Sequence, residues 1–150
     1  MRTLRLTKIL EYYDVPQLFL ATDQLNSNFI CMMTEFIAGT GYIYFAVQIS
    51  DTKLRNFLLG EEDLRQIYLH PEVDDAYFRV VVHNQIISAE SFSRDSITES
   101  ILPDDGYYYE EDEDAENYEL IAKTQQEHFT IIRLGFVDQH NSHEIDTECL

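Results

Sequence analysis

The first fifty residues carry four strand-like segments joined by very short polar turns. In the first segment, residues 4–13, Leu4, Leu6 and Lys8 alternate with Arg5 and Thr7, and Ile9 and Leu10 then lead into Tyr12 and Tyr13. Residues 17–22 and 42–49 are rich in apolar residues, and residues 29–33 form a nearly continuous apolar run. Such a run suits a strand that is covered on both faces. Parallel strands need a crossover of about a dozen residues or more, and these connections are much shorter. The spacing therefore predicts an antiparallel meander.

The hydrophobic period changes after residue 50. Ser50 or Asp51 is expected to cap a helix that Gly60 ends. Asp63 is expected to begin a second short helix that stops before Pro71. In both segments apolar residues recur at i, i+3 and i+4, as on one helix face: Leu54, Phe57 and Leu58, then Leu64, Ile67 and Tyr68.

The second half of the chain has weaker signals. Residues 76–82 have strand character, and residues 86–87 fit either a strand or a polar loop. Residues 120–122 and 129–136 form a last apolar element, which we expect to be a strand. The whole pattern predicts one α+β domain over residues 1–150: a mainly antiparallel sheet of about five to seven strands with a short helical pair at about 51–70. Residues 138–150 are polar and are expected to be a frayed tail.

An acidic, tyrosine-rich segment at residues 104–119 interrupts the last apolar elements. It has nine acidic residues in sixteen positions and no lysine or arginine. Residues 104–150 together hold fourteen acidic residues and two basic ones, so most of the net charge of −18 lies in the last third of the chain. A surface of this charge repels nucleic acid and anionic lipid and attracts basic protein. Neither direct nucleic-acid binding nor membrane binding is expected.

Three interpretations of this segment can be compared. It can be a solvated loop that adds solubility. A calcium-binding EF-hand loop is excluded, because the sixth and twelfth positions from Asp112 are Asn117 and Lys123 instead of glycine and glutamate. It can also dock a basic protein, since tyrosine is enriched at the centres of interfaces. The candidate partner-binding residues are Tyr107, Tyr108, Tyr109, Glu110, Glu111, Asp112, Glu113, Asp114, Glu116 and Tyr118.

Other patterns do not add up to a metal centre or an active site. His140 and His143 have an H-x-x-H spacing that zinc could use, but they lie in a polar stretch without an ordered scaffold. Cys31 lies in an apolar run and Cys149 in an acidic tail, so neither has the electropositive neighbours that activate a thiolate. No glycine-rich phosphate loop and no glycine-flanked nucleophilic serine is found. We therefore expect a non-enzyme with no cofactor and no metal.

Composition also bears on the compartment. The N-terminal residues interleave charged and apolar side chains and lack the apolar core of a signal peptide. No stretch approaches the roughly 20 apolar residues of a membrane span. Two cysteines far apart in the chain favour a reducing compartment. A cytoplasmic protein is expected.

Residues 9–19 read ILEYYDVPQLF, and this run resembles the opening of a family of short uncharacterised bacterial proteins with an "LEYYDGPQLF"-like N-terminal motif. The stretch from Gly60 to Arg65 is similar to a Gly-Glu-x-Asp-Leu-Arg segment of that family. Val15 stands in place of the motif's glycine, which indicates that position 15 does not need a positive φ. The resemblance implies a bacterial or phage cytosolic protein, encoded beside a partner that it regulates, and it brings no functional residue with it.

These observations predict a non-catalytic, acidic accessory or regulatory protein that binds a basic protein surface, as a subunit or regulator of a bacterial system, anti-phage systems included. One alternative is a nucleic-acid mimic that occupies the site of a DNA- or RNA-binding protein. The other is a small enzyme whose site the sequence does not reveal. A mimic needs carboxylates laid out over an ordered surface, whereas a subunit needs an apolar patch with an acidic rim. The oligomeric state stays open.

Overall fold

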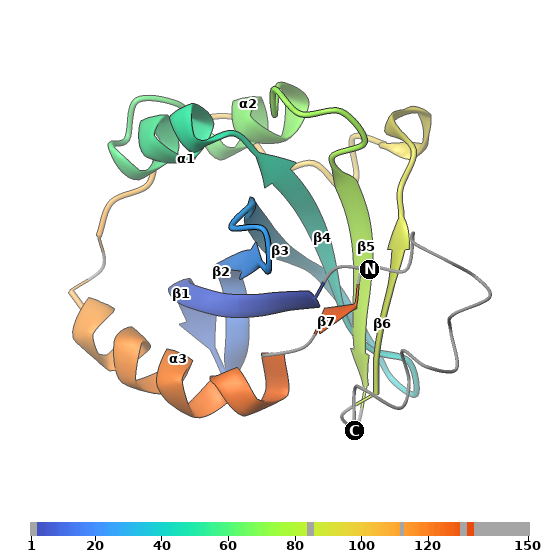
Figure 1. Cartoon of the computed structure of the whole chain (residues 1–150), viewed down its shortest axis with the longest axis vertical. Helices are drawn as coiled ribbons and strands as arrows, with labels where there is room; N and C mark the ends of the chain where they lie inside the picture. The colour runs from blue at the N-terminus through green and yellow to red at the C-terminus, as the bar shows by residue number, and fades with distance from the viewer. Residues whose placement is uncertain (1–2, 84–85, 112, 130–131, 134–150) are drawn as a thin grey trace.

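A computed structural model describes residues 3–83, 86–111, 113–129 and 132–133. Its centre is a seven-stranded sheet with the strand order β6-β5-β4-β3-β2-β1-β7, in which every neighbouring pair is antiparallel (Figure 1). The strands are β1 (Thr3–Tyr13), β2 (Val15–Asp23), β3 (Asn28–Ile37), β4 (Gly41–Ile49), β5 (Tyr77–His83), β6 (Ile86–Ser91) and β7 (Ile132–Arg133). The expected α+β class and the antiparallel meander of the first four strands are confirmed.

The sheet curls strongly instead of lying flat. The short strand β7 pairs with the start of β1, where Thr3 lies opposite Arg133, and β7 also contacts β6 at the other edge. The pairing of β1 with β2 contains register shifts, between Leu6 and Lys8 and again after Ile9. Extra residues of this kind bend a strand and increase its twist. The two edges of the sheet therefore approach each other (Figure 1).

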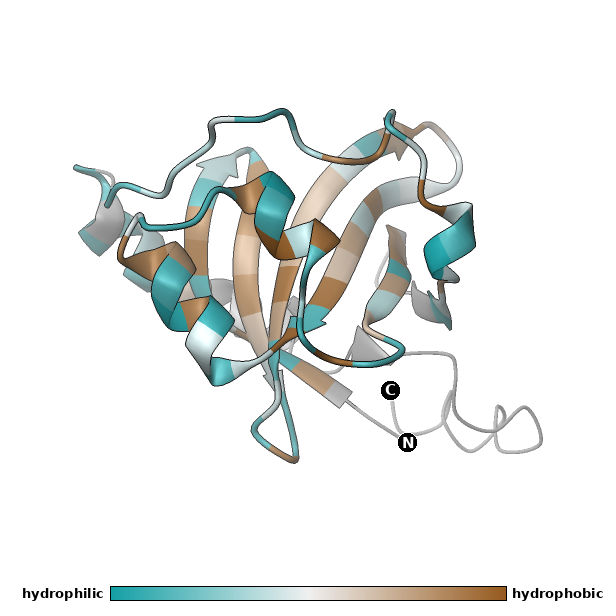
Figure 2. Ribbon diagram, turned by 90° about the horizontal axis from the view of Figure 1, so that it is seen from above, coloured by the Kyte–Doolittle hydropathy of each residue, from teal (hydrophilic) through white to brown (hydrophobic). Residues whose placement is uncertain are grey.

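Both faces of the sheet are buried, each in a core of its own. Alternate residues point to opposite sides of a strand, so Phe19 and Cys31 enter one core while Leu20 and Ile30 enter the other. The first core is covered by helix α3 (Ala115–Phe129). The second is covered by α1 (Asp51–Leu58), α2 (Leu64–Leu69) and the segment 97–109. Hydrophobic bands on the strands lie beneath helices whose outward residues are hydrophilic (Figure 2).

The helical pair begins and ends where the sequence predicts. The Ser50 side chain accepts a hydrogen bond from the Lys53 N–H at 3.1 Å, and Asp63 accepts one from the Gln66 N–H at 2.8 Å. Both are N-caps, which satisfy amide groups that the first turn of a helix leaves unpaired. Gly60, just beyond α1, has φ +73°, a conformation that favours glycine.

One element differs from the expectation. Residues 120–122, expected in a strand, lie in the middle of α3, which begins inside the 104–119 segment. Tyr118, Ile121 and Ala122 recur at i, i+3 and i+4 and face the first core, so the helix period overrides the short apolar run. Of the strand expected at 129–136, Ile132–Arg133 form β7, whereas Phe129 ends α3, and residues 130–131 and 134–136 lie outside the described residues. Residues 86–87 begin β6. The expected frayed tail at 138–150 lies outside the described residues.

A short 3₁₀ helix at Arg94–Ser96 follows β6. No helix in the described part of the chain is long and apolar enough to cross a membrane.

Candidate docking surface

The acidic segment, residues 104–119, runs along one side of the molecule from the α1–α2 corner to α3 (Figure 1). Its first half has no regular secondary structure, and its second half enters the first turns of α3. Asp112 lies outside the described residues. The other eight carboxylates are all exposed: Asp104, Asp105, Glu110, Glu111, Glu113, Asp114, Glu116 and Glu119.

Backbone hydrogen bonds attach the start of the segment to α2. The Leu64 N–H donates to the Tyr107 carbonyl at 2.9 Å, and the Gly106 N–H donates to the Asp63 carboxylate at 3.0 Å. Asp63 is itself buried and also caps α2, so one carboxylate connects the helix start to the segment. Because both bonds involve the main chain or a capping residue, this part of the segment has a defined path.

Tyr107 adds a long-range contact to the same attachment. Its hydroxyl donates a hydrogen bond to the Glu11 carboxylate on β1, and its ring packs against the second core. The bond joins two residues 96 positions apart in the chain. Tyr107 therefore ties the acidic segment to the sheet as well as to α2.

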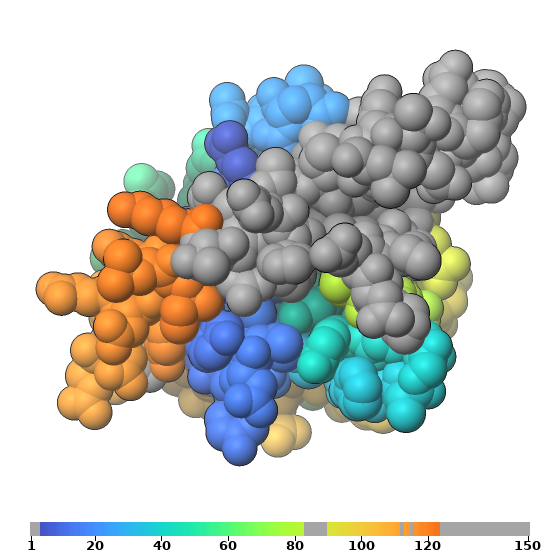
Figure 3. Space-filling model, turned by 90° about the horizontal axis from the view of Figure 1, so that it is seen from below, coloured from blue at the N-terminus to red at the C-terminus, as the bar shows by residue number. Residues whose placement is uncertain are grey.

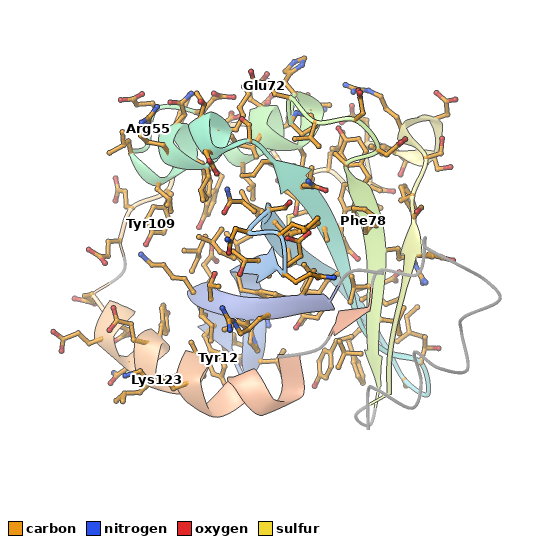
Figure 4. The ribbon with its side chains drawn as sticks, in the orientation of Figure 1. Tyr12, Arg55, Glu72, Phe78, Tyr109 and Lys123 are labelled. Atoms are coloured by element: carbon orange, nitrogen blue, oxygen red, sulfur yellow. The ribbon has the colours of Figure 1, made fainter. Side chains whose placement is uncertain are left out.

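Tyr109 is the segment's deepest anchor. Only 9% of it is exposed, its ring lies 5.8 Å from the Phe57 ring of α1, and the Lys8 ammonium lies 5.8 Å from its centroid (Figure 4). A Cβ placed on Gly60 would lie 3.2 Å from the Tyr109 carbonyl oxygen, so the α1 end and the segment are in close contact. Tyr109 belongs to the second core.

The four tyrosines predicted to bind a partner do not all lie on one accessible surface. Tyr107 is half-buried, Tyr109 is buried, and Tyr118 packs from α3 against the first core. Only Tyr108 of these four is strongly exposed, at 54%. Tyr107 and Tyr109 pack toward the second core, whereas the Tyr108 side chain between them is exposed. Leu59, 64% exposed and next to Gly60, lies on the neighbouring corner of α1.

Arg65 holds the chain just before the acidic segment. Its guanidinium donates to both Glu99 carboxylate oxygens, at 2.7 and 2.6 Å, and to the Pro103 carbonyl at 3.1 Å. Its Nε lies 3.5 Å from the Asp105 carboxylate. The hydrogen bond to Glu99 raises the pKa of Arg65, so this side chain stays fully charged. These contacts tie Glu99, Pro103 and Asp105 to α2.

Few positive charges offset the exposed carboxylates. Lys8 lies under Tyr109, Arg65 is engaged as described, and Lys53 forms an ion pair with Glu62 at 2.6 Å. Arg55 and Lys123 are exposed, on α1 and α3 respectively, on either side of the segment (Figure 4). Seen from below, the acidic N-terminal half of α3 lies beside the β1–β2 hairpin and forms one flank of the molecule (Figure 3). This flank presents a predominantly negative surface.

A cavity of about 500 Å³ opens where the segment passes over the sheet. Residues from β1, β2, β3 and α2 line it together with the start of the acidic segment. Glu11, Met32 and Met33 are among them, and none of the three is among the candidate residues expected from the sequence. No local pattern marks them, because they meet residues 103–107 only through the fold.

The described residues include no group of three or more His, Cys, Asp or Glu placed to hold a metal ion. His140 and His143 lie outside them. Burial raises the pKa of the Cys31 thiol, so this cysteine stays protonated in the folded protein and is a core side chain.

A family model described as a family of unknown function (DUF6575) matches residues 1–143. The chain belongs to this family, and the expected membership of an uncharacterised family is confirmed. No curated protein matches the chain, and no solved structure matches it.

Proposed function

We propose that this DUF6575 protein is a non-catalytic, acidic accessory or regulatory protein that binds a basic protein surface through residues 104–119. One observation carries the proposal: all eight described carboxylates of the segment are exposed, while three of its four tyrosines anchor it to the folded domain. The negative charge is thus held on a surface of defined shape.

Anchoring the segment supports binding in energetic terms. A disordered acidic tail must be ordered when it binds, and the lost conformational entropy lowers its affinity. Here the hydrogen bonds of Gly106 and Tyr107 and the burial of Tyr109 supply that order before the partner arrives. The surface carboxylates would raise the association rate by attracting a positively charged partner.

Apolar groups within the acidic surface support a protein partner. Leu59 and Tyr108 are exposed where the α1 corner meets the segment, and Glu61 and Glu110 follow close by in sequence. Interfaces combine an apolar or aromatic centre with a polar rim, and tyrosine is enriched at such centres. This pairing fits a subunit or regulator, and the sequence resemblance supports a bacterial cytoplasmic setting.

A nucleic-acid mimic is the second candidate. The eight exposed carboxylates described between Asp104 and Glu119, with no basic residue between them in the sequence, favour it. The partner would then use the same basic surface for DNA or RNA. Competition separates the two functions: a mimic is displaced from its partner by duplex DNA, and a subunit bound elsewhere is not.

Parallel capture experiments test the proposal. The full chain and a Glu110→Gln, Glu111→Gln, Glu113→Gln variant would serve as baits in an extract of the source cells, at low and at high salt. The proposal expects a basic protein that the full chain retains at low salt, that high salt releases, and that the variant fails to retain. Retention of the same proteins by both baits would contradict it, as would binding of the full chain to duplex DNA at physiological salt.

A further inference from the structure

We propose that the cavity beside the acidic segment receives an arginine or lysine side chain of the basic partner. This inference rests on the proposed function and adds a specific recognition site to it. The cavity is about 500 Å³, within the roughly 300–1,000 Å³ typical of ligand sites. It opens at the start of the acidic segment, next to the surface proposed to meet the partner.

The walls of the cavity combine two kinds of chemistry. Its apolar part includes Leu18 on β2, Met32 and Met33 on β3, and Leu64 at the start of α2. Its charged part consists of Glu11 on β1 and of Asp104 and Asp105 at the start of the segment. Neither lysine nor arginine is among the lining residues.

A long cationic side chain matches both parts. Lysine and arginine lay their aliphatic stems along apolar surface and keep the charged end with polar groups. Met32 and Met33 both line the cavity and are half-buried, but Met32 packs against the second core together with Leu18 and Leu64, whereas Met33 packs against the first core. Methionine is unbranched and flexible, which lets it adapt to the shape of an entering stem.

The carboxylates are placed to meet the charged end of such a side chain. They differ in the interactions that they already make within the protein. Glu11 accepts one hydrogen bond, from the Tyr107 hydroxyl, which leaves further acceptor positions on a carboxylate. Asp105 lies 3.5 Å from the Arg65 Nε, but Arg65 makes its closer contacts with Glu99. Glu11, Asp104 and Asp105 together make the lining negative. An anionic or fully apolar occupant would be disfavoured by this lining.

Methionine NMR reports directly on the cavity. The chain has three methionines, and two of them, Met32 and Met33, line the site. With ¹³C-labelled methionine methyl groups, titration with an octaarginine peptide is expected to shift the Met32 signal more than the Met33 signal, because Met33 packs against the opposite core. An octacitrulline peptide, which has a similar shape but no charge, should leave them in place.

A matched pair of variants measures the contribution of the site to affinity. Glu11→Gln keeps an acceptor for Tyr107 but removes the charge inside the cavity, and Glu72→Gln removes one charge from an exposed position outside it (Figure 4). Octaarginine binding should weaken about tenfold in Glu11→Gln and about twofold or less in Glu72→Gln.

The possible outcomes distinguish a failure of the cavity proposal from a failure of the proposed docking function of residues 104–119. If octaarginine binds the full chain but leaves Met32 and Met33 unshifted, or if the two variants weaken binding equally, the cavity proposal is overturned and the acidic docking surface stands. If free arginine shifts both signals and octaarginine does not, the site belongs to a small molecule, and the proposal is again overturned. If octaarginine does not bind at low salt, both proposals fail.

Discussion

The ring of Tyr109 packs 5.8 Å from the ring of Phe57, and this contact joins an acidic segment to a helix that precedes it by some fifty residues. It places a tyrosine that is surrounded by carboxylates in sequence inside the hydrophobic core. Buried tyrosines such as Tyr109 therefore attach the segment to the fold, and different residues of the segment face the solvent.

Replacing Tyr109 should therefore destabilise the fold, whereas replacing Tyr108 should not. We expect Tyr109→Ala to lower the free energy of unfolding by about 3 kcal/mol, as for a truncated buried aromatic side chain. The matched Tyr108→Ala change removes a 54% exposed ring and should cost less than about 0.5 kcal/mol. Urea denaturation measures both values, and equal losses in the two variants would refute the assignment of Tyr109 to the core.

Gly60 should tolerate no side chain without a loss of stability. Its φ is +73°, and an added Cβ would lie 3.2 Å from the Tyr109 carbonyl oxygen. We expect Gly60→Ala to cost about 1–2 kcal/mol, the price of a left-handed conformation for an L-residue. Gly39 is the control, because its φ is also positive, at +84°, but no atom lies within 4 Å of an added Cβ. Gly39→Ala therefore measures the cost of backbone strain without a steric contact. A Gly60→Ala loss below that of Gly39→Ala would contradict the close approach.

The first turn should show an asymmetry between its two tyrosines. Tyr12 packs against the first core and its hydroxyl donates to the Asp14 carbonyl at 2.9 Å, whereas Tyr13 is 77% exposed. We expect Tyr12→Ala to destabilise by about 2 kcal/mol, less than a fully buried aromatic residue. Tyr13→Ala should have little effect on the thermal midpoint. The reverse order would show that the side chains point the other way.

Alkaline conditions should unfold the protein through its buried tyrosines. Burial raises the pKa of Tyr68 well above its ordinary value of about 10. Above that value the unfolded chain loses the proton while the folded chain keeps it, so stability is full below about pH 10 and falls as the pH rises further. Tyr68→Phe should make the unfolding free energy fall less steeply with pH above about pH 10, because the release of about one proton on unfolding is removed. It should also cost about 1–2 kcal/mol at neutral pH, because the hydroxyl donates to the Ile30 and Phe45 carbonyls. An unchanged slope in denaturation measured from about pH 8 to 11 would contradict this.

Local signals in the sequence predict much of this fold. The turn at Asp14 and the caps at Ser50 and Asp63 depend on neighbouring residues, and they appear where expected. Position 15 has no positive φ, in agreement with a valine there, and Asp14 takes the positive φ of 62° instead. Residues 120–122 form a short apolar run that favours a strand, although Tyr118, Ile121 and Ala122 have the helical spacing of α3.

The candidate site could be predicted only in part. The acidic residues are exposed, as a charged run usually is, but the burial of Tyr109 depends on Phe57 and Lys8. The cavity depends on Glu11 and Tyr107, which are 96 positions apart and meet only in the folded chain. A single sequence has no local feature that encodes such contacts.

Affinity for an octaarginine peptide as a function of salt tests the acidic docking surface most directly. The comparison is between two triple variants with the same change in charge: Glu110→Gln, Glu111→Gln, Glu113→Gln in the segment, and Glu35→Gln, Glu72→Gln, Glu90→Gln at exposed positions elsewhere. We predict that the segment variant binds about tenfold more weakly at low salt and that the control binds within about threefold of the full chain. High salt should remove the difference. Equal weakening in the two variants would show that the peptide responds to net charge alone, and would contradict a docking role for residues 104–119.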